Sequence, residues 1–358
     1  MFEIIEYQDK YRQDVVRLLG AFWKINQEMA EALFQWKYVD CPFSDAVNIV
    51  LLKKQQRIVG MRGAYILQLQ YGQQVVKSGL LGDTLIEEAY RGQGQLSPLT
   101  DYLLSLLTRN GISMALNTSA TAPVWKHSIK HGWKSTEPFT AWQKHDQEKI
   151  KTASGFAVSD KAIGYVQPGE SGNLIYSNQI YSQQMAALCQ KTAAKDKAEI
   201  KKDETYFNWR YFKPTNQYRF IYLFAKETNA AEASDSQTIS TANLKGFLVL
   251  SASPLSLGSQ GSLADWGFSD VKSLRTLVLL FLQINPFYQV DCIAEPGSEL
   301  MEMLQQEWPQ KNHRSEKFPA RILSKQPGKE NQAVPEQIAD RLDSLDIWRH
   351  SPINLDAI

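Results

Sequence analysis

The pattern of hydrophobic and polar positions in the first 133 residues predicts a succession of strands and helices. Apolar residues recur at helical spacing in two segments, and Asn110-Gly111 ends the second of them. Between these segments lie three runs rich in Val, Ile, Leu and Tyr, separated by polar stretches short enough for hairpins. A meander flanked by helices is an α+β order, not the strict alternation of a doubly wound sheet. The predicted strands are 2–6, 47–53, 58–69, 74–86 and 112–116, and the predicted helices cover 11–22, 99–107 and 123–131.

An internal repeat predicts that this plan occurs twice. The segment Phe34-Gln35-Trp36-Lys37-Tyr38 recurs as Phe207-Asn208-Trp209-Arg210-Tyr211, and a proline follows each copy. Strand and helix patterns after the second copy repeat those after the first. The sequence therefore predicts two domains, 1–150 and 151–358, with a boundary near residue 150. Residues 228–243, rich in Ala, Ser, Thr and Asp, predict a disordered surface insertion in the second domain.

Composition narrows the class of protein. The chain has 358 residues, 43% of them hydrophobic and 22% charged, which is typical of a soluble globular protein with two domains. A formal net charge of +1 gives no general attraction to nucleic acid or to an anionic membrane. The longest strongly apolar run, 277–284, is far too short to span a bilayer, so we expect a cytoplasmic protein. Cys41, Cys189 and Cys292 lie far apart without nearby histidines, so we expect free thiols and no metal site.

Two glycines stand where a predicted strand turns into a predicted helix. Arg91-Gly92-Gln93-Gly94 follows the strand, and Ser97-Pro98 is suited to a helix start. Glycines let the main chain approach an anion, and the first helical turn offers unpaired N–H groups, so a pyrophosphate suits this turn. The loop follows the last strand of a meander and lacks the GK[ST] ending, which excludes a dinucleotide fingerprint and a P-loop. A tight turn without a ligand is the alternative for an isolated GxG.

Carboxylates on the preceding strand are candidates for acid–base chemistry. At period two, Asp83, Leu85 and Glu87 share one face, from which Asp83 or Glu87 could act as a general acid or base. Asp265 takes the place of Asp83 in the second copy, where no glycine loop follows, and this favours a structural role for Asp83. Trp36 and Tyr38 either line an acceptor pocket or pack in the core.

Residues 86–94 resemble the RxxGxG/A signature of the GNAT (Gcn5-related N-acetyltransferase) superfamily, with Arg91 and Gly94 matching. Trp36-Lys37-Tyr38, Asp83 and the closing Gly132-Trp133 extend the resemblance to about residues 1–135, and the second half follows the plan more weakly. It implies two GNAT-like domains in tandem, each a mixed, mainly antiparallel sheet flanked by helices. It also implies an acyl-CoA site, with pantetheine along the strand and pyrophosphate on the loop, at Leu85, Ile86, Glu87, Arg91, Gly92, Gln93, Gly94, Gln95, Leu96 and Ser97.

The function implied by this resemblance is an acyl-CoA-dependent N-acyltransferase, with acetyl-CoA as the default co-substrate and a small-molecule or sugar amine as acceptor. The family's general acid is often a Tyr four residues before the closing Gly, where this chain has Ser128. Catalytic candidates are thus Asp83, Glu87 and Ser128, and substrate candidates are Trp36, Tyr38 and Asn117. The second copy carries bulky aromatics and two acids over 264–270, so we expect no CoA there.

Two other functions stay open at this point. Tandem GNAT-like domains also occur in FemAB-like transferases that use aminoacyl-tRNA, although near-neutral charge disfavours an RNA partner. A non-catalytic CoA-binding or scaffold protein is the third reading, since fold alone never establishes activity. The sequence leaves the oligomeric state open.

Overall fold

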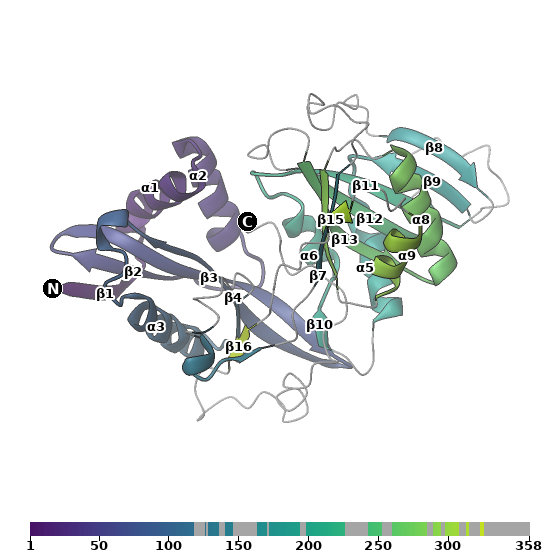
Figure 1. Ribbon diagram of the computed structural model, residues 1–358. Helices are drawn as coiled ribbons and strands as arrows, with labels where there is room; N and C mark the ends of the chain where they lie inside the picture. The colour runs from purple at the N-terminus through teal and green to yellow at the C-terminus, as the bar shows by residue number, and fades with distance from the viewer. Residues whose placement is uncertain are drawn as a thin grey trace.

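Two sheets, each flanked by helices, form two lobes that lie side by side in a computed structural model of the chain (Figure 1). The fold is α+β, with mixed and mainly antiparallel sheets, as predicted. The predicted boundary near residue 150 and the predicted insertion at 228–243 fall almost entirely outside the described residues. The structure describes residues 1–117, 126, 128–135, 140–145, 163–169, 172–193, 198–225, 243–252, 260–284, 289–294, 298–307, 313–314 and 323–325.

The first lobe follows the meander that the sequence predicts. Strands β1 to β4 pair antiparallel in chain order, and β4 then pairs with β5 in parallel. Helices α1 and α2 cover one face of this sheet and α3 covers the other (Figure 1). The elements are β1 Phe2–Glu6, η1 Asp9–Tyr11, α1 Arg12–Trp23, α2 Gln27–Phe34, η2 Gln35–Val39, β2 Asn48–Lys54, β3 Arg57–Tyr71, β4 Gln74–Ile86, η3 Glu88–Tyr90, α3 Leu96–Arg109, β5 Met114–Asn117 and β6 Lys134–Ser135.

The second lobe repeats this pairing scheme. Strands β9, β11, β12 and β13 pair antiparallel, and β13 pairs with β14 in parallel, as β4 does with β5. Asn26 caps α2 and Asp203 caps α6 in the same way, each accepting from the N–H three residues later. The elements are β7 Thr140–His145, β8 Ile163–Gly169, β9 Gly172–Ser177, α5 Ser182–Thr192, β10 Ala198–Ile200, α6 Glu204–Arg210, β11 Gln217–Phe224, β12 Leu244–Ala252, β13 Gln260–Phe268, α8 Val271–Ile284, β14 Gln289–Ala294, α9 Glu299–Glu307, β15 His313–Arg314 and β16 Leu323–Lys325.

The two halves exchange strands, which the sequence pattern does not reveal. β7, which follows the first half along the chain, pairs with β14 and β15 in the second sheet. β16, which follows the second half, pairs with β5 and β6 in the first sheet. β10 also leaves its own half and pairs with the end of β3. Each half therefore completes the sheet of the other, and one hydrophobic cluster contains buried residues from both.

Two tryptophans of the repeated segment meet where the halves join. The rings of Trp36 and Trp209 stack, with centroids 4.9 Å apart and planes 7° from parallel. Each indole N–H donates to the main-chain carbonyl of the other residue, at 2.9 Å in both directions. This reciprocal arrangement relates the two copies by an approximate twofold axis. The repeated Trp is therefore part of the contact between the halves.

Replacing either tryptophan with Phe is expected to destabilise the protein by about 1–3 kcal/mol, because a buried carbonyl loses its donor. Both carbonyls lose their donors in the double variant, so its effect should differ from the sum of the single effects. Urea unfolding of Trp36→Phe, Trp209→Phe and the double variant measures this coupling. Strict additivity would contradict a coupled pair.

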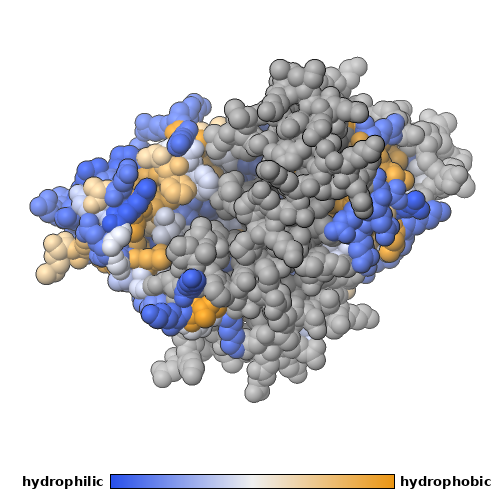
Figure 2. All heavy atoms as spheres, viewed as in Figure 1, coloured by the Kyte–Doolittle hydropathy of each residue, from blue (hydrophilic) through white to orange (hydrophobic). Residues whose placement is uncertain are grey.

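The surface view shows hydrophilic residues around small groups of hydrophobic ones on the described part of this face (Figure 2). The large apolar side chains that are exposed, such as Phe22, Val75 and Phe212, come from different parts of the chain. In the described part of the chain, no helix is both long and apolar enough to cross a membrane.

Candidate functional site

The glycine loop has the backbone shape that its sequence suggests. Gly92 and Gly94 have φ angles of +73° and +76°, a left-handed conformation that other residues adopt at a cost. A Cβ atom placed on either glycine would meet no atom of the described part of the chain within 4 Å. Crowding by the protein therefore does not require glycine at these two positions, so the open space is free for a ligand.

The main-chain donors of this loop are free. Among the residues that the structure describes, no atom accepts a hydrogen bond from the main-chain N–H groups of Gly92, Gln93, Gly94 or Gln95. The helix that follows, α3, has no side-chain cap on its first turn. Free N–H groups and the positive end of a helix together favour an anion.

The equivalent helix of the second lobe is already occupied by a carboxylate. Asp270 accepts from the N–H of Ser273 at 2.8 Å in the first turn of α8. Hydrogen bonds from Ser269 and Ser273 hold the pKa of Asp270 below its usual value. An incoming phosphate would meet this negative charge, which agrees with the prediction that the second copy binds no CoA. That prediction stays untested.

A β-bulge lies at the level where β4 parts from β5. Asp83 and Thr84 of β4 stand opposite the single residue Arg62 of β3, and Asp83 has a φ of +45°. The parallel pairing of β4 with β5 ends at Leu81 and Asn117, while β4 continues to Ile86. Among the described strands, none pairs with residues 82–86 on that side of β4. This leaves an open strand edge that leads to the glycine loop.

The main-chain N–H and C=O groups of Ile86 face this open edge. Glu87 donates its N–H to Val59 of β3 at 2.9 Å, so by alternation Ile86 and Thr84 face away from β3. The Ile86 carbonyl accepts from Arg91 Nε at 2.8 Å. The edge groups that an extended ligand could pair with thus belong to Ile86 and Thr84. The sequence prediction named Ile86 together with Leu85 and Glu87, and it missed Thr84 because the register was unknown.

Asp83 lies in a buried cluster on the α1 and α2 side of the sheet. Its carboxylate accepts from Lys37 Nζ at 2.7 Å, from the Tyr38 hydroxyl at 2.5 Å and from Trp23 Nε1 at 3.3 Å. Burial alone would raise the pKa of Asp83, but the Lys37 charge and these hydrogen bonds outweigh it and hold the pKa below its usual value. Burial and the Asp83 charge raise the pKa of Tyr38 well above its usual value. A buried carboxylate so satisfied is a poor base.

Asp265 has the same surroundings in the second lobe. Its carboxylate accepts from the Tyr211 hydroxyl at 2.8 Å and from Lys202 Nζ at 2.5 Å. Burial alone would lower the pKa of Lys202, but the negative charge of Asp265 outweighs it and raises that pKa. Both lobes therefore contain a buried Asp–Tyr–Lys cluster, although the lysine comes from different points in the two copies. This repetition favours a structural role for Asp83, while its catalytic role stays a prediction.

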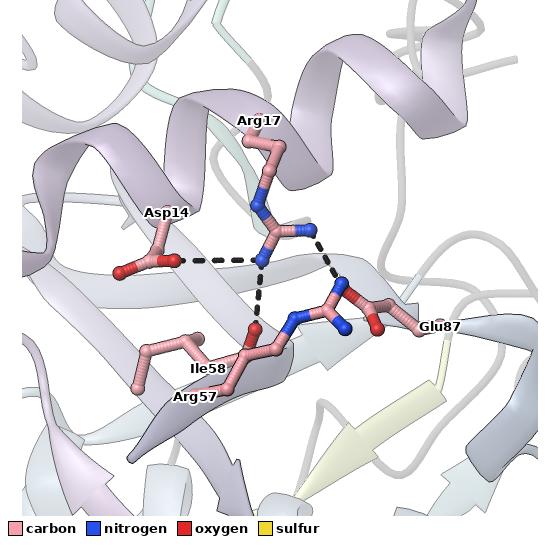
Figure 3. Close-up of polar contacts among 5 residues, drawn as sticks. All are labelled: Asp14, Arg17, Arg57, Ile58 and Glu87. Carbon is pink, nitrogen blue, oxygen red and sulfur yellow. Dashed lines mark hydrogen bonds and ion pairs between the residues drawn. The ribbon is translucent and has the colours of Figure 1, made fainter.

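Glu87 lies between two guanidinium groups (Figure 3). Arg17 Nη1 donates to it at 2.6 Å and Arg57 Nη2 at 2.9 Å. Arg17 also donates to the Ile58 carbonyl at 2.8 Å, which fixes its position above the end of β4. These contacts join α1, β3 and β4 at the edge of the sheet. Glu87 therefore has a structural task besides its predicted catalytic one.

Replacing Glu87 with Gln separates these two tasks. Loss of a general base slows a reaction by about 10²–10⁴-fold. The structural contacts predict a change in kcat/KM of less than about fivefold, because Gln retains an oxygen that accepts from both arginines and partly exposed ion pairs contribute little. Steady-state kinetics of Glu87→Gln with its pH profile checks this expectation, and a hundredfold loss would restore Glu87 as the base.

Arg62 is the residue of this region that the sequence interpretation missed. Only 4% of it is exposed, and its Nε has no hydrogen-bond partner among the described residues. Burial lowers the pKa of Arg62 to about 10, so it stays charged at neutral pH. It lines a small cavity, about 10 Å³ in volume, with Ser128, His131, Trp133 and the α3 residues Leu96, Ser97, Thr100 and Asp101. An arginine within an apolar strand pattern is the one signal that could have drawn attention to it.

The structure brings some of the other predicted residues together and keeps others apart. Ser128 is buried and lies beside the first turn of α3. Asn117 is buried at the end of β5, where that strand meets β16. Trp36 contacts the other half of the chain, and Tyr38 contacts Asp83. Their assignment to an acceptor pocket stays a prediction.

Comparison with known proteins places this geometry in a fold family. No family model matches the sequence, and no curated protein matches it either. A GCN5-related N-acetyltransferase from Anabaena variabilis superposes with a TM-score of 0.58 at 11% identity, over 92% of this chain and 73% of that one. A tandem GNAT protein from the clavulanic acid biosynthesis pathway gives 0.53 at 9%, over 92% and 100%. The Saccharomyces cerevisiae N-myristoyltransferase with bound myristoyl-CoA gives 0.54 at 12%, over 91% and 80%.

These superpositions cover both lobes at once, and one of the proteins is a tandem GNAT protein. At such low identity they concern the fold and not the reaction. The strand order, the β4 bulge and the glycine loop before α3 agree with the resemblance drawn from residues 86–94. The chain has the GNAT fold, in a tandem arrangement.

Proposed function

We propose that the protein transfers an acyl group from acyl-CoA to an amine, with acetyl-CoA as the donor. The observation that carries this proposal is the set of free N–H groups at Gly92, Gln93, Gly94 and Gln95, directly before a helix without a side-chain cap. A pyrophosphate would accept from these donors. The first lobe holds the donor, because Asp270 fills the equivalent place in the second lobe.

The open edge of β4 orients the rest of the donor. Pantetheine contains amides, which can pair with the main chain of Ile86 and Thr84 as a strand would. Arg91 now donates to the Ile86 carbonyl, and it is exposed enough to turn towards the phosphates when the donor arrives. This path places the thioester near the bulge at Asp83. The acceptor is a small-molecule or sugar amine in this proposal, and its nitrogen attacks the thioester carbon.

Titration calorimetry with acetyl-CoA tests donor binding, and thiol release with a panel of amines tests turnover. The proposal expects acetyl-CoA to bind and at least one amine to release CoA faster than water does. Free adenosine and acetate are suitable controls, because neither carries a pyrophosphate. Absence of acetyl-CoA binding would reject the donor site. Binding without turnover across amino sugars, polyamines and amino acids would leave the non-catalytic CoA-binding function in its place.

A further inference from the structure

A buried arginine without a partner is unusual, since an unpaired charge in a protein interior is costly. Among the described residues, no hydrogen bond or ion pair reaches the side chain of Arg62. Other cations near the end of β4 are engaged: Lys37 by Asp83, and Arg17 and Arg57 by Glu87. Arg62 is therefore a buried positive charge for which the described residues provide no counter-ion.

The position of Arg62 indicates which anion this is. Arg62 stands opposite the bulge of Asp83 and Thr84, at the level where β4 and β5 part. Its cavity also borders the first turn of α3 and Ser128. A cavity of about 10 Å³ is close to the lower limit for one water molecule, so it is too small for a phosphate. On the proposed donor path along β4, the group that comes nearest to this cavity is the sulfur at the end of pantetheine.

With Ser128 at this position, the cavity beside Arg62 has no side chain there that can protonate a leaving thiolate. The resemblance puts the general acid at this position, and a serine hydroxyl is far less acidic than a thiol. A positive charge can assist the departure of a thiolate without giving up a proton. Arg62 reaches the cavity from the opposite strand, β3, and provides that charge.

We propose that Arg62 stabilises the thiolate of CoA as it leaves, in place of a general acid at residue 128. This inference rests on the proposed acyl-CoA function. The amine nitrogen forms a bond to the thioester carbon, the carbon–sulfur bond breaks, and its electron pair stays on sulfur as a thiolate. The proton from the new amide nitrogen goes to solvent. Arg62 donates hydrogen bonds to the sulfur and keeps its own protons throughout.

The acidity of the bound CoA thiol tests this directly, without any acceptor. The thiolate absorbs in the ultraviolet, so a pH titration of the complex gives the thiol pKa. An adjacent cation lowers a thiol pKa by about 1–3 units. Wild-type protein should lower it by about that much, Arg62→Lys should lower it partly, and Arg62→Met should abolish the effect. Asp101 and His131 also line the cavity, so Asp101→Asn and His131→Asn are measured alongside.

A second measurement compares CoA with desulfo-CoA, which lacks the sulfur. Arg62→Met should weaken CoA binding at pH 8 by about tenfold or more and leave desulfo-CoA binding unchanged. The kcat with acetyl-CoA should fall by about 10²-fold, while KM changes little. The melting temperature of Arg62→Met should rise, because an unpaired buried charge is removed. A merely structural arginine would give the opposite change in melting temperature.

The outcomes separate this inference from the proposed function. If CoA does not bind to wild-type protein, the acyl-CoA function itself fails. If CoA binds with the thiol pKa of free CoA, or if Arg62→Met weakens desulfo-CoA as much as CoA, the thiolate role of Arg62 is overturned. A thiol pKa that responds to His131→Asn and not to Arg62→Met would also overturn it.

Discussion

Replacing Gly94 with Trp is expected to weaken acetyl-CoA binding by at least about 100-fold, because the side chain fills the space that a pyrophosphate needs. A bond between a neutral donor and a charged group contributes about 1.5–3 kcal/mol, and about 1.4 kcal/mol corresponds to a tenfold change in affinity. Displacing the phosphates from two N–H groups is enough for the expected loss. Titration calorimetry measures it. Among the described residues, no atom lies within 4 Å of a Cβ placed on Gly94, so the cost of the substitution to the apoprotein at this atom is backbone strain and not a clash.

A matched control isolates the ligand effect from backbone strain. Gly72 also has a positive φ, +56°, and is exposed at the turn between β3 and β4. Gly72→Trp therefore has the same kind of conformational cost, about 1–2 kcal/mol, far along the sheet from the glycine loop. It should leave acetyl-CoA affinity unchanged. Equal affinities for wild type and Gly94→Trp would place the pyrophosphate away from this loop.

Local patterns predict the strands β1 to β5 of the first lobe, whereas helix α2 and the strands β10 and β16 of its sheet were not predicted. The Val- and Ile-rich runs at 47–53, 58–69 and 74–86 are strands in the structure, because their apolar side chains pack on both faces of a sheet covered by helices. The glycines at 92 and 94 adopt the conformation that only glycine adopts freely. Each of these features depends on neighbours in the sequence, and so the sequence reveals them.

Features that depend on contacts between residues far apart in the sequence could not be predicted from local patterns. The exchange of β7 and β16 joins residues that lie far apart along the chain, such as Thr140 with Ala294 and Asn117 with Leu323, and the short strand β16 carries no distinctive pattern. Arg62 is one charged residue in a long apolar strand, and its lack of a partner is visible only in three dimensions. For Asp83 the repeat favours a structural role, but its three donors come from α1 and η2, and this contact is visible only in the structure.

The repeat itself separates a structural residue from a catalytic one. Asp83 and Asp265 have similar partners, but a free glycine loop follows only the first. A role that both lobes share does not depend on CoA binding. A role confined to the first lobe, such as that of Arg62, is tied to the donor site. The duplicated chain thus contains its own control for the substitution of Asp83.

Replacing Asp83 with Asn is therefore expected to act mainly on stability, and Asp265→Asn should act in the same way. Each substitution leaves a buried lysine without its carboxylate, and breaking a buried pair from one side costs about 3–5 kcal/mol. Lys37 and Lys202 are both buried. Urea unfolding of the two variants measures the cost. At temperatures where both variants are folded, kcat with acetyl-CoA should fall by a similar, small factor in each.

The pH dependence of the free energy of unfolding tests the structural role of Asp83 independently. The pKa of Asp83 is lower in the folded protein than in the unfolded chain. Its contribution to stability is therefore complete above the unfolded value, about 3.9, and is lost as the pH falls towards the folded value. The stability difference between wild type and Asp83→Asn should be largest near neutral pH and shrink below about pH 4. If Asp83→Asn lowers kcat a hundredfold while Asp265→Asn does not, and both unfold alike, Asp83 is a base after all.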